Sequence, residues 1–423
     1  MLKPDVNERL VRVGPGQPAG ELFRRYWQPV LLASELAEND GPPLGLRILG
    51  EDLVAFRDTN GRVGLVDAFC PHRRAPLFFG RNEECGLRCV YHGWKFDADG
   101  HCVDMPTEPA DTPLKSEVRI KHYPTIEKGG LIWAYLGPPA AMPAPPDYEW
   151  TRAPSTHRHL SKTIEECNYL QALEGGLDTA HSSFLHNNRL GDTKLLRNRD
   201  GAPRIEIQPA DYGYAYVSMR DAGVDGRYVR VYHYVMPAQQ MRANTMTRVG
   251  KPSKVPRLDG HIWVPIDDEH TCVFNWGYAY DASVRFTDEY KDAVDADYGR
   301  GKDDIIPGTF RLKRNLSNDF MIDRQIQKTQ TFTGIKGINT QDFALQEGMG
   351  PIVDRSKEYL GNSDMPIVTM RRMLLDAMTA VERGESPPAT DPETYRRVRP
   401  HDRVVSDGQD WRPIFAPELV AKW

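Results

Sequence analysis

The chain lacks the usual features of membrane, secreted and nucleic-acid-binding proteins. Its 423 residues contain no run of about eighteen apolar residues, the length that a membrane-spanning helix needs. The first residues, Met1-Leu2-Lys3-Pro4-Asp5, do not contain the apolar core of a signal peptide. No block rich in lysine and arginine occurs, and the net charge is −5 at pH 7. We therefore expect a cytoplasmic protein that binds neither membranes nor nucleic acid.

Cysteine is scarce, and a nucleotide-binding motif is absent. Six cysteines occur in 423 residues, and their spacing does not match a disulfide framework. Two of them belong to the motif described next, and the other four are expected to be free thiols in a reducing compartment. Gly14-Pro15-Gly16 lacks the strand-to-helix context of a dinucleotide fingerprint. The chain is therefore not expected to bind a nicotinamide or flavin nucleotide itself.

Two cysteine–histidine pairs are the most informative feature that the chain does contain. Cys70-Pro71-His72 is followed, after sixteen further residues, by Cys89-Val90-Tyr91-His92. Two thiolates and two imidazoles in this order suit a Rieske [2Fe–2S] cluster, in which one iron takes two sulfurs and the other takes two nitrogens. A structural zinc site is the alternative, but zinc fingers usually place both cysteines before both histidines. The pattern favours the cluster, which accepts one electron at a time.

A second metal site is indicated in the segment 174–186. Asp178, His181 and His186 supply two imidazoles and a nearby carboxylate, the donor types of the facial triad in non-haem Fe(II) oxygenases. Asp178 and His181 are three residues apart and would share one face of a helix. His181 and His186 are five apart, so a helix would have to end or distort between them, for example at Ser182 and Ser183. Unrelated histidines on a surface helix are the alternative reading.

The third ligand of this second site must come from elsewhere in the chain. Asp342, at the start of a helical stretch over residues 341–349, is the preferred candidate. Asp319, Asp323 and Glu347 compete with it, and spacing alone does not separate the four carboxylates. A one-electron donor and a mononuclear iron site in one chain would together make a mechanism for activating O2.

The pattern of apolar residues, turns and prolines divides the sequence into an all-β region and an α+β region. Short alternating apolar stretches from Leu46 to Val66, and the turn Asp58-Thr59-Asn60-Gly61, predict a small all-β domain. Residues 137–154 contain six prolines, which indicates a semi-rigid linker. A helix is expected from Glu165 to Leu177, with further helices over 341–349 and 365–384. The strands expected in the second region cover residues 204–208, 213–220, 227–236, 261–266 and 271–280.

The chain resembles the Rieske non-haem iron ring-hydroxylating oxygenases, in particular their phthalate dioxygenase-like branch. The resemblance extends over nearly the whole length. The segments that carry it are Tyr26-Trp27-Gln28-Pro29, Cys70 to Leu77, Cys89 to Phe96, Asn168 to Gly176, Asp178, His181 and His186.

The resemblance implies a domain organisation and two cofactors. The expected fold is α+β, with an N-terminal all-β Rieske domain and a C-terminal helix-grip domain, an antiparallel sheet flanked by helices. The implied ligands are Cys70, His72, Cys89 and His92 for one [2Fe–2S] cluster, and His181, His186 and Asp342 for one mononuclear Fe(II). The expected boundaries are 1–45 for a segment packed on the catalytic domain, 46–137 for the Rieske domain, 138–154 for the linker and 155–423 for the catalytic domain.

The family also implies how the subunits cooperate. It implies a head-to-tail homo-oligomer, a trimer or two stacked trimers, in which the cluster of one chain serves the iron of its neighbour. Asp178 matches the family's bridging acid, which would hydrogen-bond His181 and, across the interface, His92. Such a contact fixes the orientation of both imidazoles.

The expected activity is cis-dihydroxylation of an aromatic carboxylate such as phthalate, isophthalate or a chlorobenzoate. O2 is the second substrate, and a separate flavin/iron–sulfur reductase would supply electrons from NAD(P)H. Arg204 and Arg242 are candidate carboxylate anchors because a guanidinium binds a carboxylate with two parallel bonds, and Thr179 is a further candidate for the pocket. The alternatives are a monooxygenase that demethylates a methoxylated aromatic acid, and a Rieske electron carrier without catalysis.

Overall fold

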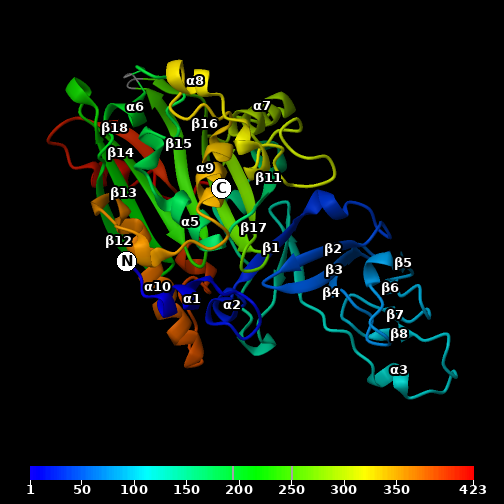
Figure 1. Cartoon of the computed structure of the whole chain (residues 1–423). Helices are drawn as coiled ribbons and strands as arrows, with labels where there is room; N and C mark the ends of the chain where they lie inside the picture. The colour runs from blue at the N-terminus through cyan, green and yellow to red at the C-terminus, as the bar shows by residue number, and fades with distance from the viewer. Residues whose placement is uncertain (193–194, 249–250) are drawn as a thin grey trace.

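Two regions of different architecture make up the molecule. The structure, a computed structural model, describes residues 1–192, 195–248 and 251–423. Small sheets gather at one end of the molecule, and a large sheet covered by helices forms the other end (Figure 1). None of the helices in these described ranges is long and apolar enough to cross a bilayer.

The N-terminal region contains three small antiparallel sheets. The first consists of β1 (Trp27–Leu32), β10 (Leu131–Tyr135) and β9 (Thr125–Lys128), and the second of β2 (Leu44–Ile48), β3 (Glu51–Arg57) and β4 (Val63–Asp67). The third consists of β5 (Arg81–Glu83), β6 (Gly86–Arg88), β7 (Lys95–Phe96) and β8 (Cys102–Asp104). A separate small core lies between these strands, and it includes Cys70, Cys89 and Trp94. Both predicted cluster thiols are therefore buried in one all-β region.

The C-terminal region is built on one antiparallel sheet of eight strands. Seven strands follow in the order β11-β17-β16-β15-β14-β13-β12, and β18 pairs with β14 beside them. Their bounds are Arg158–Glu165 (β11), Arg204–Ala210 (β12), Gly213–Asp221 (β13), Arg227–Val235 (β14), Gln239–Arg248 (β15), Lys251–Pro265 (β16), Thr271–Ala279 (β17) and His401–Val405 (β18).

Helices cover this sheet; one of them carries the predicted ligand Asp342, and another leads into the segment with His181 and His186. The helices that position the site are α5 (Tyr169–Leu177) and α9 (Ile338–Gly348). Gln171 in α5 joins them, because its Nε2 donates to the carbonyl oxygens of Gln346 and Gly350 at 2.8 Å each. The other helices are α1 (Pro4–Val11), α2 (Pro18–Phe23), α3 (Leu114–Glu117), α4 (Glu149–Arg152), α6 (Leu196–Arg199), α7 (Asp288–Tyr298), α8 (Arg324–Thr329), α10 (Met365–Glu382) and α11 (Trp411–Phe415).

The N-terminal helices lie against the catalytic region. The Tyr169 hydroxyl in α5 donates to the carbonyl oxygen of Leu10 at 2.7 Å. Asn168 caps α5 by accepting from the Leu170 N–H, and its side-chain amide also donates to the Val11 carbonyl oxygen at 3.0 Å. One asparagine therefore fixes both the start of α5 and the end of α1.

The predicted α+β class is confirmed, and several predicted elements are found with shifted ends. Residues 341–349 and 365–384 correspond to α9 and α10, and the five predicted strands all occur. The expected helix from Glu165 is wrong at its start: Glu165 is the last residue of β11, and α5 begins only at Tyr169. The strands β11, β15 and β18 are not among the predicted ones, and β16 begins ten residues before the expected 261.

Two glycines allow α5 to approach its neighbours closely. A Cβ atom on Gly176 would lie 2.2 Å from the Trp263 ring of β16, and one on Gly175 would lie 1.8 Å from the side-chain amide of Gln346 in α9. Both distances are far below van der Waals contact. Glycine at these positions therefore sets the separation of α5 from the sheet and from α9.

We predict that Gly176→Ala lowers the free energy of unfolding by about 1–3 kcal/mol, because the new methyl group must displace a buried indole. Gly348→Ala is the matched control, since it is also helical and nothing lies within 4 Å of the position of its Cβ. Denaturant unfolding followed by tryptophan fluorescence measures the difference. Equal stability of the two variants would contradict the packing role of Gly176.

Candidate cluster site and mononuclear iron site

Two loops of matching backbone geometry carry the predicted cluster ligands. In the first loop, the Cys70 N–H donates to the Ala75 carbonyl oxygen at 2.9 Å, and the Arg74 N–H donates to Cys70 at 2.8 Å. In the second, the Cys89 N–H donates to the Trp94 carbonyl oxygen at 2.8 Å, and the Gly93 N–H donates to Cys89 at 2.9 Å. The fifth residue of each loop has a positive φ, 57° at Arg74 and 74° at Gly93. The loops are therefore two copies of one hydrogen-bonded frame.

The side chains on these loops converge. The imidazole rings of His72 and His92 lie 4.5 Å apart between centroids, and His72 stacks on the Trp94 indole at 4.3 Å. Cys70 and Cys89 are buried and form no disulfide. Burial raises the pKa of the Cys70 thiol to about 12, so a bound metal would have to displace its proton. Two buried thiols beside two imidazoles fit the ligand set of a Rieske cluster.

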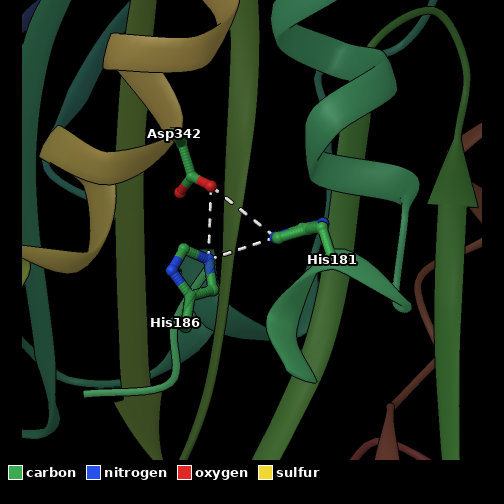
Figure 2. A group of neighbouring side chains, drawn as sticks. All are labelled: His181, His186 and Asp342. Atoms are coloured by element: carbon green, nitrogen blue, oxygen red, sulfur yellow. Dashed lines mark hydrogen bonds and ion pairs between the residues drawn. The ribbon is translucent and has the colours of Figure 1, made fainter. Parts of the chain in front are cut away.

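The second predicted site is a compact group of three side chains. The Nε2 atoms of His181 and His186 are 3.1 Å apart, and Asp342 Oδ1 lies 3.2 Å from His186 Nε2 and 3.6 Å from His181 Nε2 (Figure 2). Each side chain contributes one donor atom within 4.8 Å of the others. Two imidazole nitrogens and one carboxylate oxygen on one side of a point fit a facial triad for non-haem iron.

The chain between the two histidines turns in the way that their spacing requires. The α5 helix ends at Leu177, and Asp178 has extended backbone angles, so Asp178 and His181 do not share a helix face as predicted. His181–Ser183 forms a separate 3-10 turn that ends at Phe184. The distortion expected near Ser182 and Ser183 therefore occurs, but α5 has already ended before His181.

Asp178 orients the His181 ring. Its Oδ2 lies 3.3 Å from His181 Nδ1, and its Oδ1 accepts the Ala180 N–H at 2.7 Å. Burial is the largest single influence and would raise the pKa of Asp178, but the hydrogen bond and charge of His181, together with the Ala180 and His181 N–H groups, lower it overall. The ionised carboxylate keeps the proton on Nδ1 and leaves Nε2 of His181 free to bind a metal.

Gln341 performs the same task for His186, and sequence reasoning missed it. Its Oε1 lies 2.9 Å from His186 Nδ1, while its Nε2 donates to Asn188 Oδ1 at 2.7 Å and to the Ile335 carbonyl oxygen at 2.8 Å. The two donated bonds fix which end of the amide faces the histidine. His186 Nδ1 is therefore the protonated nitrogen, and Nε2 points to Asp342. In the sequence, the only indication that Gln341 belongs to the site is that it directly precedes Asp342.

The competing carboxylates lie outside the triad. Asp319 has a left-handed backbone in a kinked turn over Leu316–Met321, and Asp323 caps α8 by accepting from the Gln325 and Ile326 N–H groups. Glu347 Oε1 accepts the Glu166 N–H at 3.1 Å. Among the described residues, Asp342 is the carboxylate that groups with His181 and His186.

A cavity of about 140 Å³ adjoins the triad. Its wall includes all three triad side chains and Asp178, together with a polar group from the large sheet. That polar group consists of Glu165, Arg230, Gln240, Arg242, Asn244 and His261. Burial, followed by the charge of Arg242, lowers the pKa of His261 to about 3, so His261 is neutral at pH 7.

Positive charge exceeds negative charge on the sheet side of the cavity. Arg242 Nε donates to Asp259 Oδ1 at 2.5 Å, and Arg257 Nε donates to the other oxygen of Asp259 at 3.0 Å. Arg230 reaches the cavity wall too, with its Nε donating to the Ala243 carbonyl oxygen at 2.8 Å. Arg242 and Arg257 therefore share one carboxylate, and Arg230 adds a third guanidinium group between Asp402 and Asp259. An anion in the cavity would compensate the remaining charge.

Of the three predicted substrate-binding residues, two line the cavity and one does not. Arg242 and Thr179 both line the cavity, and Thr179 is buried with its hydroxyl 3.4 Å from Ser218. Arg204 does not: its side chain is 74% exposed and pairs with Glu206 in the same strand. The reason is its position on β12, at the end of the sheet farthest from β11. Arg230 lines the cavity instead, and no sequence motif pointed to it.

Two family models match the chain. Residues 26–124 match the Rieske [2Fe-2S] domain, and residues 134–421 match the model described as LigXa C-terminal domain like. Together they cover both sites described above. The first match resolves the choice between an iron–sulfur cluster and structural zinc in favour of the cluster.

Curated relatives match over nearly the whole chain. The phthalate 4,5-dioxygenase oxygenase subunit of Pseudomonas putida is 40% identical, with 98% of this chain and 95% of the relative covered. The 3-chlorobenzoate-3,4-dioxygenase oxygenase subunit of Comamonas testosteroni is 37% identical, with 98% of each covered. The 5,5'-dehydrodivanillate O-demethylase oxygenase subunit of a Sphingobium strain is 34% identical, with 92% and 83% covered.

The fold has solved counterparts. The structure of NdmA from Pseudomonas putida CBB5 with caffeine superposes with a TM-score of 0.63, covering 93% of this chain and all of that one. The sequence identity is 18%, so this likeness concerns the fold alone.

We predict that Gln341→Ala weakens binding of the mononuclear iron by about 10–100-fold, because His186 loses the partner that orients it. Iron titration of protein depleted of mononuclear iron measures this affinity, and the cluster absorbance should not change. Gln325→Ala, on the exposed side of α8, is the control. Unaltered iron affinity in the Gln341 variant would show that His186 is held by other contacts.

The comparisons and the geometry lead to one assignment. Both family models match in the expected chain order, and relatives with 34–40% identity over most of this chain are oxygenase subunits. The residues at both sites fit the cofactors that these domains hold. The chain belongs to the Rieske non-haem iron ring-hydroxylating oxygenases, as an oxygenase subunit with a Rieske [2Fe–2S] domain and a mononuclear iron domain.

Proposed function

We propose that this oxygenase subunit cis-dihydroxylates an aromatic carboxylate bound in the cavity beside His181, His186 and Asp342. The main support for this proposal is the hydrogen bonding of the Arg242 guanidinium group. Its Nε is held by Asp259, whereas its Nη1 and Nη2 form no hydrogen bond or ion pair with any other residue that the structure describes. A substrate carboxylate can accept from both of these nitrogens.

The size of the cavity supports a substrate with a single ring. A cavity of about 150 Å³ accommodates benzene, and the cavity here is about 140 Å³. The two relatives with the highest identities reported above are named for phthalate and 3-chlorobenzoate, both of which are benzene carboxylates. Size, charge and relationship therefore favour the same class of substrate.

Each residue of the site has a defined task in the proposed reaction. His181, His186 and Asp342 would hold the iron, which supplies O2 activation when it is bound. Asp178 and Gln341 keep both Nε2 atoms unprotonated and aimed at the metal. Arg242 orients the ring through its carboxylate, and the buried wall excludes bulk water.

Electrons reach the site from a separate reductase, as in other oxygenase subunits of multicomponent dioxygenases. We propose that the reductase carries flavin and an iron–sulfur centre, and that it reduces the cluster held by Cys70, His72, Cys89 and His92. The cluster then passes electrons on one at a time.

We further propose a head-to-tail homo-oligomer, either a trimer or two stacked trimers. Within one chain, the sheet β5–β8, which holds the second cluster loop between β6 and β7, lies apart from α9 (Figure 1). Exposed apolar side chains surround each centre, which suits contact between neighbouring copies. Those near the cluster are Phe78, Phe79, Val90 and Tyr91, and those near the iron site are Phe184, Phe332, Leu345 and Met349. The second set lines a pocket of about 510 Å³ that also reaches His181 and Asp342.

O-demethylation of a methoxylated aromatic acid is the second candidate, because one relative at 34% identity is named as an O-demethylase subunit. It would use the same residues in the same roles. An electron carrier without catalysis would have no use for the grouping of His181, His186 and Asp342.

Product analysis tests the reaction type. The holoenzyme, O2 and a reductase would be incubated with phthalate, isophthalate, terephthalate, chlorobenzoates and methoxybenzoates, and products identified by mass spectrometry. A benzene carboxylate carrying two added hydroxyl groups is the expected product. Formaldehyde plus a phenol would replace our proposal with the demethylase, and no product from any acid would refute both.

In the same assay we expect Arg242→Met to raise KM by roughly 10–100-fold, since a charge-assisted hydrogen bond contributes about 1.5–3 kcal/mol. Arg204→Met is the matched control, because its guanidinium lies outside the cavity. An unchanged KM in the Arg242 variant would exclude this residue as the anchor.

We also predict that Asp178→Asn retains both metals but slows oxidation of the reduced cluster by the iron site. The variant loses the carboxylate that fixes His181. Rapid mixing of the reduced enzyme with O2 and substrate, followed at the cluster absorbance, gives the rate. Wild-type kinetics would argue against any part for Asp178 in electron transfer.

A further inference from the structure

A buried carboxyl group lines the iron-site cavity without a strong hydrogen-bond donor beside it. Glu165 ends β11, its side chain is 0% exposed, and it belongs to the same cavity wall as Asp342. Neither Oε1 nor Oε2 accepts from an N–H or O–H group of the described residues, and the neighbouring donor is the Cys167 thiol, which donates weakly. Buried polar atoms are nearly always satisfied, so an exception in an active-site wall points to a ligand or reaction that uses it.

The surroundings of Glu165 favour its protonated form. Burial raises its pKa well above the usual range for glutamate, and the charge of Glu347 on α9 acts in the same direction. The Cys167 thiol acts in the opposite direction but does not reverse the shift. At neutral pH, Glu165 is therefore a carboxylic acid that can donate a proton.

The reaction needs protons as well as electrons. An arene and O2 become a cis-dihydrodiol by taking up two electrons and two protons: the O–O bond breaks, and two C–O and two O–H bonds form. Demethylation also consumes two electrons and two protons, with water and formaldehyde as co-products. The cluster supplies electrons only. The site must therefore obtain protons by another route, whichever substrate is used.

A second buried acid, Glu347, is hydrogen-bonded to the residue that follows Glu165. Glu347 accepts the Glu166 N–H at 3.1 Å, and burial raises the pKa of Glu347 to about 7, where a carboxyl group exchanges protons readily with neutral solution. Glu166 itself is partly exposed, and its carboxylate pairs with His270 at 3.2 Å and Arg311 at 2.5 Å.

We propose that Glu165 is the proton donor of this active site, and that Glu347 returns a proton to it from the surface. In each transfer the Glu165 O–H bond breaks, and the proton joins an oxygen atom derived from O2. The carboxylate that remains is neutralised by a proton arriving through Glu347. The inference depends on the oxygenase reaction but not on the identity of the aromatic acid.

Infrared spectroscopy of the holoenzyme tests the protonation state without turnover. The wild type at pH 7 should show a carbonyl stretch of a protonated carboxylic acid that shifts in D2O and is missing in Glu165→Gln. Glu269→Gln, which removes an exposed carboxyl group, should keep the band. Absence of the band in the wild type would overturn the proposal.

Single-turnover kinetics test the role. We expect Glu165→Gln to bind iron and substrate as the wild type does, but to form product roughly 100-fold more slowly and to release more hydrogen peroxide per O2 consumed. Glu165→Asp should recover part of the rate because it keeps an acid. A wild-type rate in Glu165→Gln would refute the proposal. Loss of iron or substrate binding in that variant would also refute it, since Glu165 would then be structural.

Discussion

The close contact between α5 and α9 is the constraint on which the iron site depends. Asp342 lies on α9, and His181 and His186 follow α5 more than 150 residues earlier in the chain. Their donor atoms meet within 4.8 Å only because Gly175 and Gly176 let α5 approach Gln346 and Trp263, and because Gln171 bonds to the end of α9. The separation of α5 and α9 therefore determines where the three metal-binding side chains lie relative to one another.

The same packing gives the cavity two chemically different regions. The wall near Arg242 carries guanidinium groups, whereas the wall near Glu165 carries a buried acid whose pKa is raised. The iron ligands form part of the wall that both regions share. An anionic substrate is attracted to the first region, and protons can be delivered from the second. The site thus separates binding of the aromatic acid from the chemistry of oxygen.

The sequence alone predicts metal ligands that lie close together in the chain. It does not predict which residues meet in the cavity when that depends on how strands and helices pack. Cys70, His72, Cys89 and His92 form a local pattern whose order and spacing favour an iron–sulfur cluster over zinc, and the family match decides between the two. Asp342 had three competitors because nothing in the sequence reports how α9 lies against α5. Arg204 was wrongly placed because the order of strands in the sheet moves β12 away from the cavity. Glu165 was mistaken for a helical residue, which concealed its place in the cavity wall.

In the two cluster loops, the backbone holds the loop in shape and the exposed side chains are left for contacts with other proteins. Backbone hydrogen bonds close both loops, and one left-handed residue in each completes the turn, so the frame depends little on the remaining side chains. Pro71, Arg73, Val90 and Tyr91 are exposed on these loops. These four side chains are therefore presented to a neighbouring protein by a frame that does not depend on them. A substitution at the tips can alter the contact with that neighbour while the backbone around the cluster stays unchanged.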